Sequence, residues 1–225
     1  MPSTILIVGA SRGIGLEFVR QYAAAGDRVL ATCRKDADAG HLRMLGATAL
    51  PLDVLDADSR ARLVEQIGDA RLDLVVLSAG VYGPRTSGLE APDAAEFDRV
   101  MHTNVLAPMH LITLLAPLLA QTGAKVAVIS SRMGSIGLMN SAYGWLYRAS
   151  KAALNAALRA TSLELGARRV VCMAFHPGWV RTDMGGAGAA IDVAESVGNL
   201  RRVIAQANES HNGKFLNYTG EHLSW

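Results

Sequence analysis

A glycine-rich turn directly after a short apolar run places the strongest constraint on the fold of this chain. The run Thr4–Val8 is almost wholly apolar, which is typical of a strand buried on both faces. Gly9, Gly13 and Gly15 follow it, and a helical pattern then continues through Ala25. A strand, such a turn and a helix in this order form the setting in which glycines of this spacing bind a dinucleotide. A purely structural turn is the alternative.

Each glycine of this turn has a separate expected role. Gly9 allows the sharp turn, Gly13 lets the backbone approach a phosphate, and Gly15 lets the helix pack closely on the sheet. Ser11 and Ile14 lie between them and are expected to contact the cofactor as well. The free N–H groups at the start of the helix would then face the pyrophosphate.

Cations rather than an acid follow the second expected strand, Arg28–Thr32. Folds of this kind that select NAD carry an acidic residue at this strand end, where it holds the ribose 2′-hydroxyl. Here Arg34 and Lys35 follow the strand, no acid appears before Asp36, and Arg12 projects from the glycine turn. Because such cations suit a 2′-phosphate, the sequence favours NADP over NAD. An ordinary solvated charge cluster is the alternative.

Strand and helix patterns alternate through the rest of the chain with short links. This alternation predicts an α/β protein with right-handed crossovers: one doubly wound Rossmann domain over residues 1–225, with helices on both faces of seven parallel strands. The other expected strands are Ala47–Leu52, Leu72–Ser78, Lys125–Ser131, Val170–Phe175 and Phe215–Tyr218. The later expected helices are Asp56–Ile67, Ala94–Leu119 with interruptions near Pro108 and Pro117, Gly144–Gly166 and Ile191–Asn208.

Residues with binding chemistry gather at the carboxyl ends of the expected strands. Gly13, Arg34, Asp53 and Gly80 all follow such ends. Ligands of doubly wound sheets bind outside the carboxyl ends of the strands, where the strand order reverses. The coincidence of four such positions therefore favours a single binding cleft along this edge.

Tyr147 and Lys151 are four residues apart near the start of an Ala-rich helical run, so one helix face carries both side chains. By themselves they most resemble a surface pair. A free phenol has a pKa near 10, so bringing it to about 7 requires a shift of roughly 3 units, or about 4 kcal/mol. An ammonium one turn away acts in that direction. The pair is therefore a candidate acid if the cleft lies beside it.

Several motifs occur in the order in which the short-chain dehydrogenase/reductase family has them. They are Gly9-x-x-x-Gly13-x-Gly15, Asp53, Ser78-Ala79-Gly80, Asn104, Ser131, Tyr147-x-x-x-Lys151 and Pro177-Gly178. The chain resembles this family along its whole length. More narrowly, Tyr147–Asn155, His176–Val180 and Gly213–Tyr218 look like the C-factor and sniffer-type carbonyl reductase branch.

This resemblance implies a hydride transfer between NADP(H) and a carbonyl or alcohol substrate. It assigns proton donation to Tyr147, carbonyl polarisation to Ser131, ribose binding and electrostatic tuning to Lys151, and a water-holding role to Asn104. Thr182 would fix the nicotinamide amide. The cofactor-binding set is then Gly9, Ser11, Arg12, Gly13, Ile14, Gly15, Arg34, Asp53, Val54, Ala79, Gly80, Asn104, Tyr147, Lys151, Pro177, Gly178, Val180 and Thr182.

Three features depart from the family pattern. Val8 stands where Thr usually precedes the first glycine, and Ser78 replaces the usual Asn of the Asn-Ala-Gly triplet. The spacing from Ser131 to Tyr147 is a few residues longer than is common. The replacement at Ser78 puts a structural hydrogen bond of the central sheet in doubt and affects no catalytic atom.

Charge and cysteine content limit the partners of the chain. Lys+Arg 22 and Asp+Glu 20 give a net charge of +2 with no basic block, which does not indicate nucleic-acid binding. Cys33 and Cys172 form no CxxC and are expected to be reduced thiols in the cytoplasm. The apolar run Val105–Ala120 is short for a membrane span and contains prolines, so a buried or interface helix is expected instead. The histidines show no metal-ligand spacing, and no metal is expected.

Two classes of function remain open from the sequence. The first is an NADP(H)-dependent carbonyl reductase or alcohol dehydrogenase acting on a small molecule. The second is a non-catalytic, dinucleotide-binding signalling or regulatory protein on the same fold, which loss of the Tyr147/Lys151 pair would favour. Both residues are present, so we expect an enzyme. Val105–Ala120 and Ala152–Ala160 are expected to form the interface of a homodimer or homotetramer.

Overall fold

Seven parallel strands form one sheet in the order β3-β2-β1-β4-β5-β6-β7. The computed structural model describes residues 2–120 and 123–225. The strands are β1 (Thr4–Val8), β2 (Arg28–Cys33), β3 (Thr48–Pro51), β4 (Leu74–Leu77), β5 (Lys125–Ile129), β6 (Val171–His176) and β7 (Lys214–Asn217). The predicted doubly wound, seven-stranded parallel sheet is confirmed, with its strand order reversing between β1 and β4.

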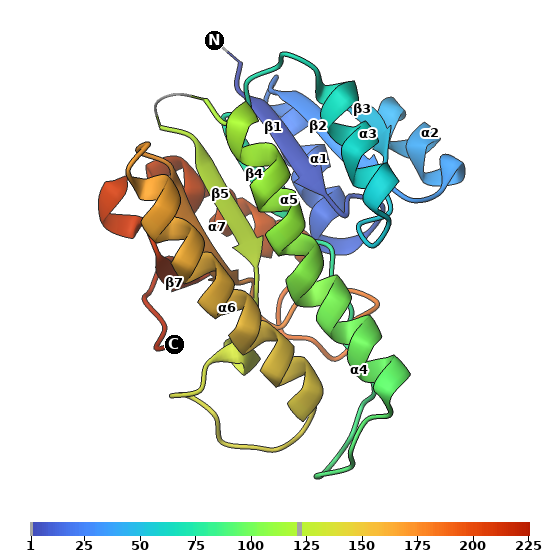
Figure 1. Ribbon diagram of the computed structural model, residues 1–225, viewed down its shortest axis with the longest axis vertical. Coiled ribbons are helices and arrows are strands. Elements are labelled where there is room, and N and C mark those ends of the chain that lie inside the picture. The colour runs from blue at the N-terminus through green and yellow to red at the C-terminus, as the bar shows by residue number, and fades with distance from the viewer. Residues whose placement is uncertain (1, 121–122) are drawn as a thin grey trace.

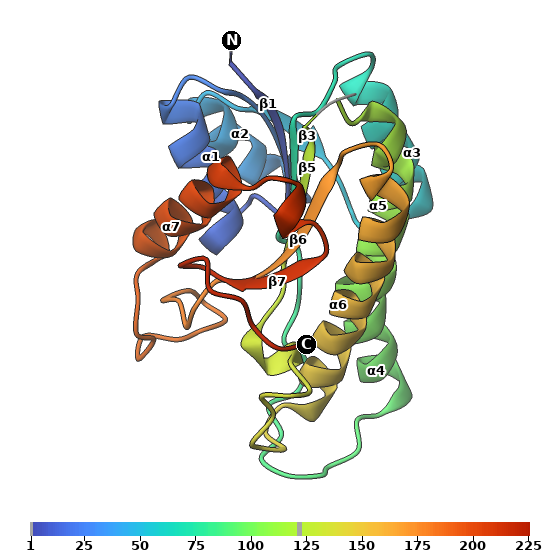
Figure 2. The same cartoon turned by 90° about the vertical axis from the view of Figure 1, so that its left-hand side faces the viewer.

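Helices cover both faces of this sheet, which is seen nearly edge-on in Figure 2. Helices α1, α2 and α7 lie on one side, and α3, α5 and α6 lie on the other (Figures 1 and 2). The helices are α1 (Gly13–Ala24), α2 (Asp36–Met44), α3 (Ala57–Ile67), α4 (Ala94–Met101), α5 (Ala107–Leu115), α6 (Trp145–Gly166) and α7 (Val193–Gln206). Each face of the sheet thus buries its own apolar layer.

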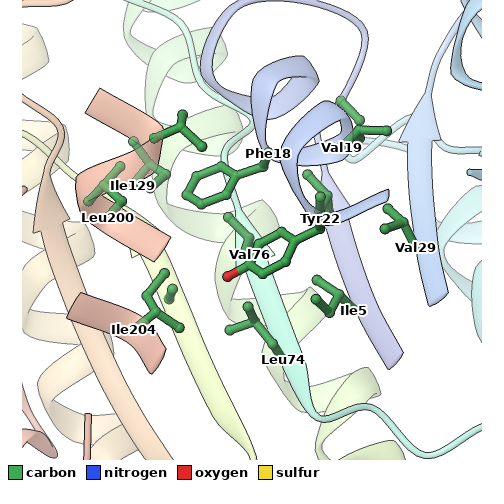
Figure 3. Packing of buried hydrophobic residues seen from close by; sticks show 14 of the residues in the cluster. Ile5, Phe18, Val19, Tyr22, Val29, Leu74, Val76, Ile129, Leu200 and Ile204 are labelled. Carbon is green, nitrogen blue, oxygen red and sulfur yellow. The ribbon is translucent and has the colours of Figure 1, made fainter. Parts of the chain in front are cut away.

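The layer beneath α1 and α7 shows why the strands are apolar on both faces. Phe18 and Tyr22 of α1 stack with ring centroids 6.0 Å apart and lie against β1 and β4, with Leu200 and Ile204 of α7 beside them (Figure 3). A second cluster fills the opposite face beneath α3, α5 and α6. Because both faces of β1 are covered, its run of apolar residues has no polar alternation.

The long helix expected over Ala94–Leu119 is interrupted, as predicted, but one turn earlier than expected. A π-helical turn at His102–Leu106 separates α4 from α5, and Pro108 lies in the first turn of α5. Proline has no N–H, so it cannot donate to the carbonyl of Asn104 four residues before it. The proline is therefore accommodated by a local change of helix type rather than by a break.

No helix in residues 2–120 and 123–225 combines the length and apolar character needed to cross a membrane. The longest helix, α6, carries Lys151 and other polar residues among its 22 positions.

Candidate functional site

A cleft of about 360 Å³ follows the carboxyl ends of β1, β2, β3, β4 and β6. It begins beside Arg34 at the end of β2 and reaches Tyr147 and Lys151 on α6. The predicted site residues on its wall are Gly9, Ser11, Arg12, Gly13, Ile14, Arg34, Asp53, Val54, Ala79, Gly80, Tyr147, Lys151, Pro177 and Thr182. Residues that lie far apart in the sequence thus meet along one edge of the sheet.

The glycine turn has no room for side chains at two positions. Gly9 has φ +83°, and a Cβ there would lie 2.6 Å from the backbone nitrogen of Ala79. A Cβ on Gly15 would overlap the carbonyl oxygen of Gly9. The turn therefore packs directly on the segment after β4 and leaves the start of α1 open to the cleft. A bare backbone at a helix N-terminus fits a dinucleotide pyrophosphate.

Cations lie at the β2 end of the cleft, but one of them has a partner that the sequence did not indicate. Arg34 is exposed on the cleft wall. The guanidinium of Arg12 reaches Asp183 at 2.6 Å, and both side chains are largely exposed, at 68% and 75%. Arg12, which was predicted to contact the 2′-phosphate, thus forms an ion pair that joins the glycine turn to the segment after β6.

Tyr147 is a buried phenol at the inner end of the cleft, with 7% of its surface exposed. Burial raises the pKa of this phenol above its ordinary value, while a hydrogen bond with Ser131 acts in the opposite direction. Ser131 is itself buried, and its hydroxyl oxygen accepts the backbone N–H of Met133 at 3.1 Å. Ser131 comes from the loop after β5 and Tyr147 from α6, and the Ser131 hydroxyl lies near enough to lower the pKa of the phenol.

Lys151 lies beside Tyr147, and a backbone carbonyl holds its ammonium. Its ammonium donates to the carbonyl oxygen of Ile129 at 2.9 Å and lies 5.7 Å from the centroid of the Tyr147 ring. Burial lowers the pKa of Lys151 to about 8. A backbone carbonyl thus holds the ammonium beside the phenol ring. The expectation that Lys151 lowers the pKa of the phenol stays a prediction.

Asn104 lies behind the cleft wall, wholly buried. Its side-chain oxygen accepts the N–H of Val81 at 2.8 Å, and its amide donates to the carbonyl of Val81 and to the Ser150 hydroxyl. A Cβ on Gly80 would lie 3.3 Å from the Asn104 oxygen and 3.6 Å from the Lys151 nitrogen. The Asn104 side chain thus fixes the segment after β4 next to Lys151.

Three other predicted cofactor-binding residues, Gly15, Gly178 and Val180, do not line the cleft. Gly15 packs under the glycine turn, and Val180 is buried and pairs with Ile191 in a short parallel bridge. Gly178 faces a different cavity.

Thr182 lies on the cleft wall, where its hydroxyl accepts the N–H of Gly185 at 3.1 Å.

An aromatic side chain that the sequence analysis passed over stacks on the candidate acid. The ring of Tyr82 lies 4.5 Å from that of Tyr147 with 19° between their planes. Arg85 lies 4.8 Å above the Tyr82 ring and donates to the carbonyl oxygen of Met184 at 2.8 Å. The sequence could have pointed to Tyr82 only through its position, because this residue comes two positions after Gly80 at the end of a strand.

The family model described as short chain dehydrogenase matches residues 3–190. The chain belongs to this family. C-signal of Myxococcus xanthus is 37% identical to this short-chain dehydrogenase over 155 residues, which cover 68% of this chain and 93% of that protein. Carbonyl reductase Sniffer of D. melanogaster superposes with a TM-score of 0.90 at 32% identity, covering 100% of both chains. A carbonyl reductase from Pseudomonas aeruginosa PAO1 in complex with NADP gives a TM-score of 0.90 at 34% identity, again covering 100% of both.

The predicted resemblance to the short-chain dehydrogenases is confirmed. Gly9, which follows Val8, donates its N–H to the hydroxyl oxygen of Thr32 on β2 at 3.1 Å. The first glycine of this short-chain dehydrogenase is thus held from the neighbouring strand. No group of three or more His, Cys, Asp or Glu side chains that could hold a metal occurs in the described part of the chain.

Proposed function

We propose that this short-chain dehydrogenase is an NADP(H)-dependent carbonyl reductase in which Tyr147 is the proton donor and acceptor. The observation that carries the proposal is the buried Tyr147 phenol on the cleft wall, with the Ser131 hydroxyl near it and the buried ammonium of Lys151 beside it. The carbonyl reductases with similar folds, one of them solved with NADP, support both the reaction class and the cofactor.

The residues on the cleft wall offer the groups that NADP(H) would need. The glycine turn offers bare N–H groups to a pyrophosphate, Arg34 offers charge-assisted hydrogen bonds to a 2′-phosphate, and Lys151 lies where a ribose of the nicotinamide half would follow. Bound NADPH supplies the hydride. Arg12 contributes to the same phosphate when its exposed contact with Asp183 opens.

The proton is handled by side chains of this chain alone. Ser131 hydrogen-bonds the substrate carbonyl oxygen and orients it toward the Tyr147 hydroxyl, which donates its proton as negative charge develops on that oxygen. Burial keeps the phenol protonated before the reaction, because it raises the pKa of Tyr147. Lys151, held by the Ile129 carbonyl, provides a positive charge near the developing phenolate.

A panel assay tests this proposal. NADPH oxidation is measured at 340 nm against aldehydes, ketones and quinones, with NADH in parallel and with a blank that lacks the carbonyl compound. We expect turnover with at least one carbonyl class and a preference for NADPH. Tight NADPH binding without turnover of any carbonyl would contradict the enzyme and favour the dinucleotide-binding regulatory protein.

We also propose self-association and a cytoplasmic location. Leu106, Met109, Leu114 and Leu163 are large apolar side chains exposed on α5, on α6 and on the turn before α5, which suits an interface between copies. Cys33 and Cys172 are buried free thiols, as expected in a reducing compartment. Light scattering at micromolar concentration should give a mass at least twice that of the chain, and a monomer there would contradict the self-association.

A further inference from the structure

A second cavity, of about 250 Å³, lies on the other side of the turn after β6. His176, Gly178 and Trp179 form one part of its wall, and Arg132 forms another. Ile191 completes an apolar portion. The cavity is thus partly cationic and partly apolar.

Two polar groups on this wall have no protein partner in the described part of the chain. The Nδ1 atom of His176 is buried and makes no hydrogen bond. No carboxylate in residues 2–120 and 123–225 forms an ion pair with Arg132. The Arg132 guanidinium is therefore available to pair with an anion in the cavity, and the His176 ring lies on the same wall.

The charge state of this wall favours an anion. Burial, with a smaller effect from Arg132, lowers the pKa of His176 to about 4. The ring is therefore neutral near pH 7 and offers a hydrogen bond, while Arg132 supplies the positive charge. Asn217 also lines the cavity, but its amide is engaged with Thr219 and Glu221.

The cavity adjoins the catalytic cleft at two points of the chain. Arg132 directly follows Ser131, which hydrogen-bonds Tyr147. His176 directly precedes Pro177, which lies on the cleft wall. A small molecule whose carbonyl group contacts Ser131 therefore has this cavity within reach of its other end.

We propose that the second cavity is a subsite for a carboxylate carried by the carbonyl substrate, bound by the Arg132 guanidinium and the His176 imidazole. A guanidinium matches a carboxylate through two parallel hydrogen bonds, and the apolar wall at Trp179 and Ile191 suits a short hydrocarbon or aromatic body. The substrate class is thus a small aldehyde or ketone acid. This inference rests on the proposed reductase function.

The kinetic test compares 3- and 4-carboxybenzaldehyde with their methyl esters, using NADPH and the full chain. We expect kcat/KM to be at least tenfold higher for an acid than for its ester. Arg132→Met should remove that preference by raising KM for the acid alone, and Arg132→Lys should keep part of it. Arg43→Met removes an exposed arginine of α2 outside both cavities and should leave the preference unchanged.

Three results of this test would overturn the subsite. They are the absence of a preference in the wild type, an equal loss for acid and ester in Arg132→Met, and the same loss in Arg43→Met. Because Arg132 is exposed, its replacement should not unfold the chain.

A binding measurement separates this inference from the proposed function. Benzoate is titrated into the wild-type protein and into Arg132→Met by calorimetry, and we expect about tenfold weaker binding to the variant. If that difference is found while no carbonyl compound is oxidised or reduced, the carboxylate site stands and the reductase proposal fails. If uncharged aldehydes are reduced but benzoate binding does not depend on Arg132, the reductase stands and the subsite is overturned.

Discussion

The two halves of the cleft use different groups of the chain. One half uses backbone groups and exposed side chains, and the other uses buried side chains. In the nucleotide half, beneath β1 and β2, recognition falls to the bare backbone of the glycine turn and to the exposed side chains of Arg12 and Arg34. In the catalytic half, Tyr147 and Lys151 are buried, with exposed fractions of 7% and 4%, and each has a defined partner. The first half therefore depends on backbone shape, and the second on individual side chains.

This difference predicts where substitutions act. In the nucleotide half, adding atoms to the backbone should be severe, while changing an exposed charge should be mild. In the catalytic half, removing a single polar group should alter chemistry or stability strongly, because its surroundings exclude water. The following predictions run from the largest expected effect on free energy to the smallest.

Gly15→Ala should destabilise the fold by about 3 kcal/mol, at the upper end of the range for overpacking, because its Cβ overlaps the Gly9 carbonyl oxygen. The matched control is Gly40→Ala in α2, where no atom lies within 4 Å of the added carbon. This control should be neutral or up to about 1 kcal/mol more stable. Urea unfolding of both variants measures the difference, and equal stabilities would break the contrast between backbone shape and side-chain chemistry.

Lys151→Met should unfold with a free energy up to about 3 kcal/mol higher than the wild type at pH 7. Burial lowers the pKa of Lys151 to about 8 from an ordinary value near 10.4, and each unit corresponds to about 1.4 kcal/mol. Between these two pH values the unfolded chain binds more protons than the folded one, so wild-type stability gains with rising pH. The gap between variant and wild type should close between about pH 8 and pH 10. A variant that is less stable than the wild type at pH 7 would show that burial of the Lys151 ammonium does not destabilise the folded chain.

Arg34→Asp should weaken NADPH binding by about tenfold relative to NADH, since one charge-assisted hydrogen bond contributes about 1.5–3 kcal/mol when buried and less when exposed. Fluorescence titration of both cofactors gives the two Kd values. Arg43→Met serves again as the control for overall charge. An unchanged ratio of the Kd values would place the 2′-phosphate away from the end of β2.

Asp183→Asn should tighten NADPH binding by about two- to threefold without changing the Kd of NADH. The substitution frees Arg12 from an ion pair whose side chains are 68% and 75% exposed, and exposed pairs contribute only about 0.2–1 kcal/mol. The same titration measures it. Weaker NADPH binding in this variant would mean that the contact between Arg12 and Asp183 helps to hold the cofactor instead of competing with it.

The sequence predicted the fold well because its signals were local. Continuous apolar runs such as Thr4–Val8 are typical of strands covered on both faces, and the glycine turn followed by a helical pattern indicated the first crossover. Strand ends differed by at most two residues: the predicted Leu72–Ser78 is Leu74–Leu77 in the structure. Such ends depend on which neighbouring strand is long enough to pair, and one sequence segment does not contain that information.

The sequence predicted the site residues whose type and position both indicate a role. It missed the contacts between side chains that lie far apart in the chain. The Arg12–Asp183 pair joins residues 171 apart, and Tyr82 stacks on a ring 65 positions further along the chain. The Ile129 carbonyl takes the Lys151 ammonium because β5 ends beside α6, a juxtaposition that helical spacing alone cannot reveal. The helical spacing predicted that Lys151 lies next to Tyr147, but the packing of β5 against α6 determines which atom the ammonium contacts.

Replacement of a single oxygen atom tests the central claim most directly. Tyr147→Phe removes the phenol hydroxyl and keeps the ring that stacks on Tyr82. With the most active carbonyl compound of the panel, we expect kcat to fall by about 10²- to 10⁴-fold while the Kd of NADPH changes by less than about twofold. Tyr143→Phe, four residues earlier and 39% exposed, is the matched control and should retain near-normal turnover. Near-normal turnover in Tyr147→Phe itself would contradict the account.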